Sequence, residues 1–345
     1  MRLSVFAAVP VASATLSFLF ILALMPTLQR YVTAQPNARS SHTKQTPQGG
    51  GLAVIAATIL TIFMFWKIAA YNDDFEFLTV LMATAFIAFV GMVDDLLTIK
   101  IFPRLALQAL AVGGVLASLP HDFHLLNFIP VWLERSFLFL AGLWFVNLVN
   151  FMDGLDLMTV AEIVPVTAAL AAFGIFGFLP TGATLIALSL CGSMVAFAYF
   201  NKPIAKLFLG DAGSLPIGLL IGWCLLQLAG AGHLVAACIL PLYYLMDSTV
   251  TLIRRIMSRE AFWVSHRSHF YQRATVNGFS VLQVITRVAL VNVALVALAA
   301  ASIIAQSASV NIICLIASAA AVTFILTQFA KPQDEFLQSS GRSRR

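Results

Sequence analysis

The sequence predicts an all-α integral membrane protein, a bundle of about eleven transmembrane helices. Of its 345 residues, 60% are hydrophobic and only 10% are charged, and the mean hydropathy is +0.93. A soluble domain carries about 25% charged residues, so a polytopic membrane protein is the class that fits. Two patterns agree with it: long apolar runs recur along the chain, and basic residues fall in alternate connections between them.

Apolar runs long enough to cross a bilayer follow one another from the N-terminus almost to the end of the chain. A spanning helix needs about 20 residues. On that rule the predicted spans lie near 3–26, 50–71, 77–93, 104–120, 136–152, 157–179, 181–200, 213–231, 233–253, 280–305 and 308–330.

Lysine and arginine set the predicted orientation. Sixteen of the twenty basic residues lie in the C-terminal tail or in the connections after the first, third, fifth, seventh and ninth spans. Because an excess of Lys and Arg marks the cytoplasmic face, the N-terminus is predicted to point outward and the tail inward. The placement of the basic residues that give the net charge of +5 therefore indicates how the chain is oriented in the membrane. No basic stripe with interleaved aromatic residues is present, which argues against nucleic acid as a partner.

The polar stretch at residues 147–156 closes the fifth span at its inner end. Asn147, Asn150, Asp153 and Asp156 recur at every third position. On an ideal helix each such step falls about 60° short of a full turn, so the four side chains fan across half the helix unless the backbone breaks, which a glycine such as residue 154 allows. A solvated turn at a helix end is the alternative interpretation.

Two further inner connections carry carboxylates at span ends. Asp94 and Asp95 abut the third span, where carboxylates need water, protons or a cation to compensate them. Asp211, with glycines on either side, stands at a helix start and suits a hard divalent cation that shares its oxygen ligands with phosphates. A solvated helix cap and an ordinary turn aspartate are the alternatives.

The first inner loop predicts an anion-binding turn. Gly49 and Gly50 open a span, where backbone N–H groups and the helix dipole favour an anion, and Lys44 adds a cation. A flexible turn is the alternative.

The last inner loop combines histidines with arginines. His266, Arg267, His269 and Arg273 are suited to grip a diphosphate, because arginine forks match phosphate oxygens. Zinc is disfavoured, since neither a cysteine nor a third histidine accompanies the pair. Attraction to anionic lipid would explain the arginines but does not require the histidines.

All these motifs fall on the inner face, where their carboxylates would repel one another without compensation. A divalent metal and a multiply phosphorylated ligand account for the acidic and the basic residues together. We therefore expect a soluble diphosphate substrate entering from the cytoplasm and a lipidic partner at the mouth of the bundle. The five aspartates concerned are Asp94, Asp95, Asp153, Asp156 and Asp211.

The chain resembles the polyprenyl-phosphate N-acetylhexosamine-1-phosphate transferases, integral membrane enzymes that load a sugar-1-phosphate onto undecaprenyl phosphate. The resemblance covers nearly the whole length and is strongest to the branch that starts O-antigen or similar surface polysaccharides. Leu157 stands where the family's central motif usually has glycine, and two residues separate the histidines that are consecutive in the muramoyl-pentapeptide branch. The matching strings are 44–50, 93–95, 147–156, 208–214, 247–251 and 265–273.

The resemblance implies a reaction and a set of partners. A UDP-N-acetylhexosamine would bind with Mg²⁺, for which Mn²⁺ is an alternative, and polyprenyl phosphate would attack the sugar-linked phosphorus and release UMP. The protein would be a multi-pass bacterial inner-membrane enzyme with a periplasmic N-terminus and a cytoplasmic active site. We expect one catalytic domain over 1–330 and a short tail over 331–345, and we leave a homodimer open.

The resemblance also implies roles for individual residues. Asp211 would be the principal metal ligand with Asp153, and Asp94 would bind or deprotonate the lipid phosphate. Asp95 and Asp156 would help to hold metal and nucleotide. The predicted substrate-binding residues are Lys44, Gly49, Gly50, Asn147, Asn150, His266, Arg267 and His269.

Three other functions fit parts of the pattern. A phospho-N-acetylmuramoyl-pentapeptide transferase would differ mainly in the histidine loop. A cation- or proton-coupled transporter would place its ionisable groups near the bilayer midplane, whereas most acids here lie at span ends. A phosphatidyl-alcohol transferase would carry an Asp-rich string on one helix, and this chain has none.

Overall fold

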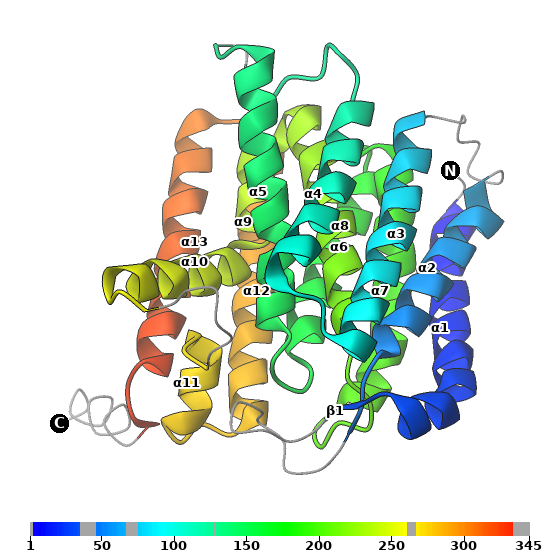
Figure 1. The fold of residues 1–345 in the computed structure, drawn as a ribbon. Helices are drawn as coiled ribbons and strands as arrows, with labels where there is room; N and C mark the ends of the chain where they lie inside the picture. The colour runs from blue at the N-terminus through cyan, green and yellow to red at the C-terminus, as the bar shows by residue number, and fades with distance from the viewer. Residues whose placement is uncertain (1–2, 35–45, 67–74, 127, 261–266, 334–345) are drawn as a thin grey trace.

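The computed structural model describes residues 3–34, 46–66, 75–126, 128–260 and 267–333, and over these ranges the predicted all-α bundle is confirmed (Figure 1). The one sheet in the described chain is a two-residue antiparallel ladder, in which Thr33 pairs with Pro47 and Ala34 with Thr46. The elements are α1 (Leu3–Tyr31), β1 (Thr33–Ala34), β2 (Thr46–Pro47), α2 (Gly50–Trp66), α3 (Phe75–Leu97), α4 (Ile101–Ser118), α5 (Val131–Met152), α6 (Met158–Ile175), α7 (Thr181–Asn201), α8 (Asp211–Leu228), η1 (Ala229–His233), α9 (Leu234–Ile239), α10 (Leu242–Met257), α11 (Phe270–Val276), α12 (Val281–Ala305) and α13 (Ala308–Phe329).

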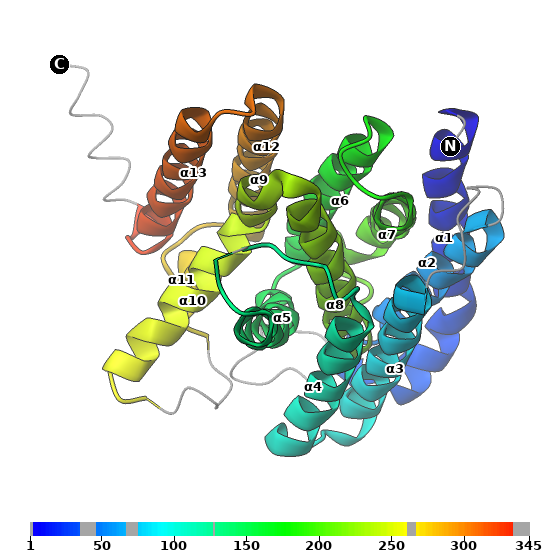
Figure 2. The ribbon, with the colours of Figure 1, turned by 90° about the horizontal axis from the view of Figure 1, so that it is seen from above.

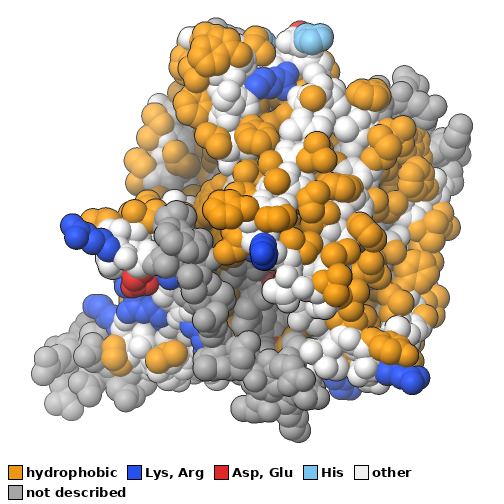
Figure 3. Space-filling view, in the orientation of Figure 1, with side chains coloured by type: hydrophobic (Ala, Val, Ile, Leu, Met, Phe, Trp, Pro, Cys, Tyr) orange, Lys and Arg blue, Asp and Glu red, His pale blue; other side chains and the backbone are white. Residues whose placement is uncertain are grey.

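Nine helices of the described chain are long and apolar enough to cross a membrane, and α2, with 17 residues, is a shorter apolar helix. Their outer faces carry large apolar side chains that are more than half exposed, as expected where lipid replaces water as the solvent. Examples are Val11, Met82, Leu110, Leu140 and Ile316. On the face seen in Figure 3, hydrophobic side chains cover most of the upper two thirds, and Lys and Arg gather mainly below.

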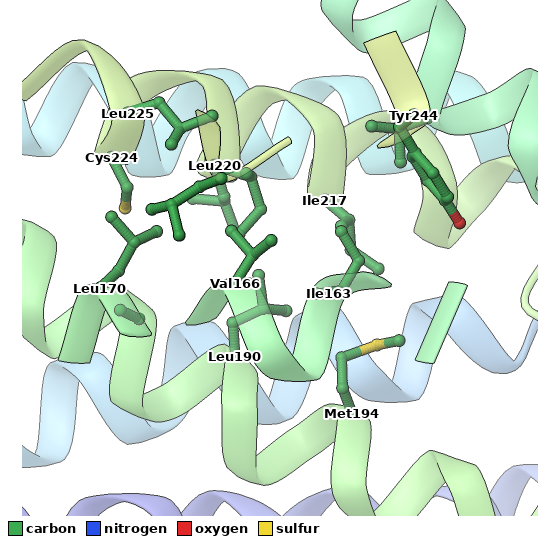
Figure 4. Close-up of a cluster of buried hydrophobic side chains, with 14 of the residues drawn as sticks. Ile163, Val166, Leu170, Leu190, Met194, Ile217, Leu220, Cys224, Leu225 and Tyr244 are labelled. Atoms are coloured by element: carbon green, nitrogen blue, oxygen red, sulfur yellow. The ribbon is translucent and has the colours of Figure 1, made fainter. Parts of the chain in front are cut away.

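The centre of the bundle lies where α6, α7 and α8 pack together. Leu170, Leu190 and Leu220, one from each helix, are fully buried, and Figure 4 shows them meeting in one cluster with Tyr244 of α10 at its edge. Small residues let backbones approach closely in a membrane, where the lipid is as apolar as the helices. A Cβ added to Gly51 would lie 2.1 Å from the Cα of Gly213, so α2 and α8 touch through their backbones.

The predicted span over 233–253 is wrong as a single helix. The chain turns at η1, where Gly232 has φ +92°, and α9 then ends after six residues, just before Pro241. Figure 2 shows α8 and α9 joined as an arch, and in Figure 1 α10 runs crosswise to the bundle. Hydropathy averages over such a run, so it does not show that α10 has one buried polar face and one exposed face.

A buried carboxylate holds the start of α10. Glu162 on α6 is 2% exposed and accepts a hydrogen bond of 2.7 Å from the side chain of Asn292 on α12. It also faces the backbone N–H of Tyr244, in the first turn of α10. The first N–H groups of a helix lack intrahelical partners, so a carboxylate placed there stabilises the new helix start. The crosswise helix is thereby fixed to the bundle.

Candidate active site

The C-terminal end of α3 and the start of α8 are joined by Asp95. Its carboxylate accepts the backbone N–H of Asp211 at 3.0 Å and of Ala212 at 3.1 Å, and Gln48 donates to it at 2.6 Å. These are the unpaired N–H groups at the start of α8, where a negative charge is favourable. Gly210, with φ +76°, leaves room for this contact, because an added Cβ would lie 2.6 Å from the Asp95 carboxylate. Asp95 therefore positions Asp211.

Arg104, at the start of α4, links Asp94 to Asp211. One guanidinium nitrogen lies 2.8 Å from the Asp94 carboxylate and 3.3 Å from that of Asp211. The other Asp94 oxygen accepts the backbone N–H of Ile99 at 2.6 Å. Two carboxylates this close repel unless a cation lies between them. The guanidinium supplies that cation here.

Asn150 brings the central motif to the same point. Its amide nitrogen donates to the free carboxylate oxygen of Asp211 at 2.8 Å and to the hydroxyl of Ser214 at 2.9 Å. Asn150 lies in the last turn of α5, and Asp211 and Ser214 lie in the first turn of α8. The predicted convergence of these two motifs is therefore present in the structure.

Asp153, which follows α5, is close to this group. Burial raises the pKa of its carboxyl to about 6; the hydrogen bond from Thr159 lowers the pKa, and the negative charge of Asp95 raises it. Direct metal binding by Asp153 stays a prediction.

The donor set of the site fits Mg²⁺. Magnesium is usually held by one or two carboxylates together with substrate phosphates. Asp211 supplies a carboxylate in an oxygen-rich surrounding, and Arg104 already marks the point beside it as favourable for a cation. Among the described residues, no three His, Cys, Asp or Glu side chains are grouped to hold a metal by themselves. A magnesium ion here would need further oxygen ligands from a phosphate, and its binding stays a prediction.

Asp156 has a structural contact. One of its oxygens accepts the backbone N–H of Ala205 at 3.0 Å, and the next residue, Leu157, donates its N–H to Asn201 at 2.7 Å. These bonds tie the loop after α5 to the loop after α7. Leu157 has φ +61°, a left-handed conformation that costs a residue with a Cβ about 1 kcal/mol. Leu157, which stands where the family's motif usually has glycine, therefore keeps the backbone conformation that a glycine would adopt. A catalytic role for Asp156 stays a prediction.

Two of the predicted substrate-binding groups have partners within the protein. The Asn147 amide donates to Gln108 of α4 at 2.7 Å and to the Leu143 carbonyl at 2.8 Å, so its contact with a substrate stays a prediction. Asn147 lies about 60° around the helix from Asn150 and about 4.5 Å further from the end of α5. The N–H of Gly50, expected to face an anion, donates to the Phe208 carbonyl at 2.9 Å.

The same glycine stretch serves packing. A Cβ on Gly50 would lie 2.7 Å from the side chain of Leu207. Gly49, with φ +99°, permits the turn that leads into α2. These glycines bring the start of α2 against the loop before α8.

The histidine loop reaches the central motif through Tyr271. Its hydroxyl donates to the Phe151 carbonyl at 3.0 Å, one residue after Asn150. His269 is 4% exposed and its Nδ1 lies 3.3 Å from an oxygen of Asp247. Arg267 is half-buried, and its charge reaches Tyr271. Lys44 and His266 lie outside the described residues, so their predicted roles stay predictions.

Sequence reasoning did not identify four residues of the site. In the sequence Arg104 served only as a basic residue that indicates orientation. Its place ten positions after Asp94, across a short turn, could have predicted an ion pair with that aspartate. Gln48 and Ser214 lie in motifs that carry the family resemblance, but the motifs do not indicate which groups their polar side chains contact. The four residues are Gln48, Arg104, Ser214 and Tyr271.

The chain has relatives among known proteins. Residues 77–229 match the model of glycosyl transferase family 4. A Bacillus subtilis (strain 168) protein named as a probable undecaprenyl-phosphate N-acetylglucosaminyl 1-phosphate transferase is 28% identical over 285 residues, which cover 76% of each chain. A phospho-N-acetylmuramoyl-pentapeptide-transferase of Streptococcus pneumoniae (strain 70585) is 30% identical over 240 residues, or 61% of this chain and 71% of the relative. The chain therefore belongs to glycosyl transferase family 4, the family of polyprenyl-phosphate N-acetylhexosamine-1-phosphate transferases.

Proposed function

We propose that this bacterial multi-pass membrane protein transfers an N-acetylhexosamine-1-phosphate from a UDP-sugar to undecaprenyl phosphate and releases UMP. Its family and its relatives support the coarser activity, a phosphotransfer from a nucleotide sugar to polyprenyl phosphate. The observation that carries the proposal is the meeting of four side chains from four helices at one end of the bundle. They are Asp94, Arg104, Asn150 and Asp211.

The proposed reaction needs positioning and charge neutralisation, which dominate phosphoryl transfer. An oxygen of the lipid phosphate attacks the phosphorus that carries the sugar, and the bond from that phosphorus to the oxygen of UMP breaks. UMP leaves with that oxygen. Mg²⁺ bound at Asp211 would neutralise the phosphate charge. A phosphate monoester has its second pKa near 6, so the attacking oxygen needs little help from a base.

Arg104 is the residue that we expect to bind the lipid phosphate. It lies at the inner end of a spanning helix, where the phosphate of a membrane-embedded lipid arrives, and arginine forks match phosphate oxygens. Both Asp94 oxygens already accept hydrogen bonds, from Ile99 and from Arg104. Asp94 would then hold Arg104 in place, a different role from the base expected from the sequence. When the nucleotide sugar binds, it would replace Asp211 as the hydrogen-bond partner of the Asn150 amide.

We further propose that the product initiates a surface polysaccharide of the O-antigen type. The support is the sequence of the histidine loop, in which Arg267 and Ser268 separate the two histidines. The muramoyl-pentapeptide version is the second candidate, favoured by the 30% identity to the pneumococcal transferase. Family membership argues against a transporter.

A membrane assay tests the activity and separates the two candidates. Purified protein is given undecaprenyl phosphate, Mg²⁺ and one of a panel of UDP-sugars that includes UDP-N-acetylglucosamine and UDP-N-acetylmuramoyl-pentapeptide, and UMP and the lipid product are measured. We expect release with an N-acetylhexosamine, its loss in EDTA and its recovery with added Mg²⁺ or Mn²⁺. Release only with the pentapeptide substrate would support the second candidate. Undiminished release in chelator would contradict the metal.

The topology makes a separate prediction. In a chain whose native cysteines are replaced by serine, Ile204→Cys and Asp122→Cys each introduce one exposed thiol, on the loop after α7 and on the loop between α4 and α5. A membrane-impermeant maleimide should label position 122 in intact spheroplasts and position 204 only after lysis. This follows from the excess of basic residues on the inner connections. The reverse pattern would place the N-terminus inside.

A further inference from the structure

We propose that Asp247 is a positioning residue that holds His269, through the start of α11, at the phosphates of the nucleotide sugar. The inference rests on the proposed function, since it assigns His269 to that substrate. Asp247 is the one carboxylate on α10, and its side chain is fully buried.

The Asp247 carboxylate organises the first turn of α11. One oxygen accepts the backbone N–H of Phe270 at 3.0 Å and lies 3.3 Å from Nδ1 of His269. The other oxygen accepts the backbone N–H of Tyr271 at 3.1 Å. A single side chain therefore satisfies two N–H groups that lack intrahelical partners and also orients an imidazole. Because an ionised carboxylate can only accept hydrogen bonds, the neutral imidazole must carry its proton on Nδ1. Its other nitrogen, Nε2, is then the atom that could contact a substrate phosphate.

The imidazole is held on its other sides by aromatic rings. The ring of His269 stacks on Tyr271 with 5.8 Å between centroids and is 6.4 Å from the ring of Phe151. The Tyr271 hydroxyl reaches the Phe151 carbonyl, and a Cβ on Gly154 would lie 2.2 Å from that hydroxyl. Phe151 follows Asn150, which bonds Asp211. The position of His269 is therefore tied to the centre of the site through α5.

The free-energy cost of burying the charge of Asp247 indicates that this residue does more than cap α11. A serine or asparagine caps a helix without the cost of burying a charge, which is high unless hydrogen bonds compensate it. Two hydroxyls, those of Tyr243 and Thr251, lie at 3.4 Å from the Asp247 carboxylate, and no lysine or arginine among the described residues forms an ion pair with it. In the described part of the chain, the imidazole of His269 is the only side chain in contact with it that can carry a positive charge. In metal sites a carboxylate beside an imidazole fixes the orientation of the histidine, and Asp247 stands in the same relation to His269.

A double-mutant cycle in the full-length protein tests the inference. Asp247→Asn should lower kcat/KM for the UDP-sugar about 10- to 100-fold, as is typical when a residue that orients a ligand-binding histidine is lost. If Asp247 acts through His269, the double variant with His269→Ala should be no slower than His269→Ala alone. Losses that multiply, or an unchanged rate in Asp247→Asn, would overturn the proposal. Asp247→Glu, which keeps the charge, is the substitute if the asparagine variant does not fold.

A matched control removes a different helix cap. Ser280 caps α12 in a capping box with Gln283, and its side-chain hydroxyl accepts the backbone N–H of that residue, so Ser280→Ala should leave kcat/KM within about twofold of the parent. An equal loss in this variant would show that any lost cap slows the enzyme, and would contradict a specific role for Asp247.

Hydrogen exchange gives a second measurement that needs no substrate. The amides of Phe270 and Tyr271 should exchange faster in Asp247→Asn than in the parent, while those of α8 keep their protection. If the parent protein transfers no sugar at all, the proposed function fails. Faster exchange at these two amides would then still support the positioning of α11 by Asp247, and unchanged exchange would reject it.

Discussion

Replacing Asp211 with asparagine should lower the rate of UMP release about 10³-fold, with the fold intact. Asp211 contacts residues from three other helices: Asn150 donates to one of its oxygens, Arg104 to the other, and its own N–H donates to Asp95. Asparagine has the same shape, so it keeps the backbone bond to Asp95 and one acceptor oxygen. It loses the negative charge that a magnesium ion requires from its protein ligand.

The measurement pairs UMP release with thermal unfolding in detergent. The melting temperature of Asp211→Asn should stay near that of the parent, because the start of α8 is fixed by backbone N–H groups and by the carboxylate of Asp95. Asp122→Asn, an exposed carboxylate on the loop between α4 and α5, is the matched control and should keep full activity. Near-normal turnover in Asp211→Asn would remove this residue from the proposed metal site.

The sequence predicts the fold class and most helices well, because the physical cause of each is local. Hydropathy alone places α5, α7, α12 and α13 to within a few residues, since burial in lipid depends on composition and length. The break before α10 was not predicted. An apolar run over 233–253 has the composition of a span, and its course depends on Gly232 and on Glu162, which lies on another helix.

The site was predicted at the level of motifs and less well at the level of side chains. Charge and spacing were enough to place Asp94, Asp95, Asn150 and Asp211 on one face. They did not show that Asp95 would bond backbone N–H groups of α8. Nor did they show that Asn147 would turn toward Gln108, because the rotation of a helix about its axis is decided by its neighbours in the bundle.

Arg104→Met should make the stability of the protein depend on magnesium. Its guanidinium is the cation between Asp94 and Asp211, and the two carboxylates would face each other without it. Removing one partner of a buried ion pair costs about 3–5 kcal/mol, and the partial exposure of this group reduces the expected loss of unfolding free energy to about 2 kcal/mol in chelator. The rate should also fall, by about 10²-fold, since the proposed contact to the lipid phosphate is lost.

Added Mg²⁺ should then raise the melting temperature of Arg104→Met by several degrees more than that of the parent, because the ion takes over the neutralisation of the two carboxylates. Arg135→Met is the matched control: Arg135 donates to the carbonyls of Pro120 and Phe123 in the loop between α4 and α5, so its loss should destabilise without creating a response to magnesium. An equal response to Mg²⁺ in the parent and in Arg104→Met would show that the ion does not bind between Asp94 and Asp211. A response confined to Arg104→Met, and absent from Arg104→Met combined with Asp211→Asn, would locate the cation at Asp211 without any measurement of turnover.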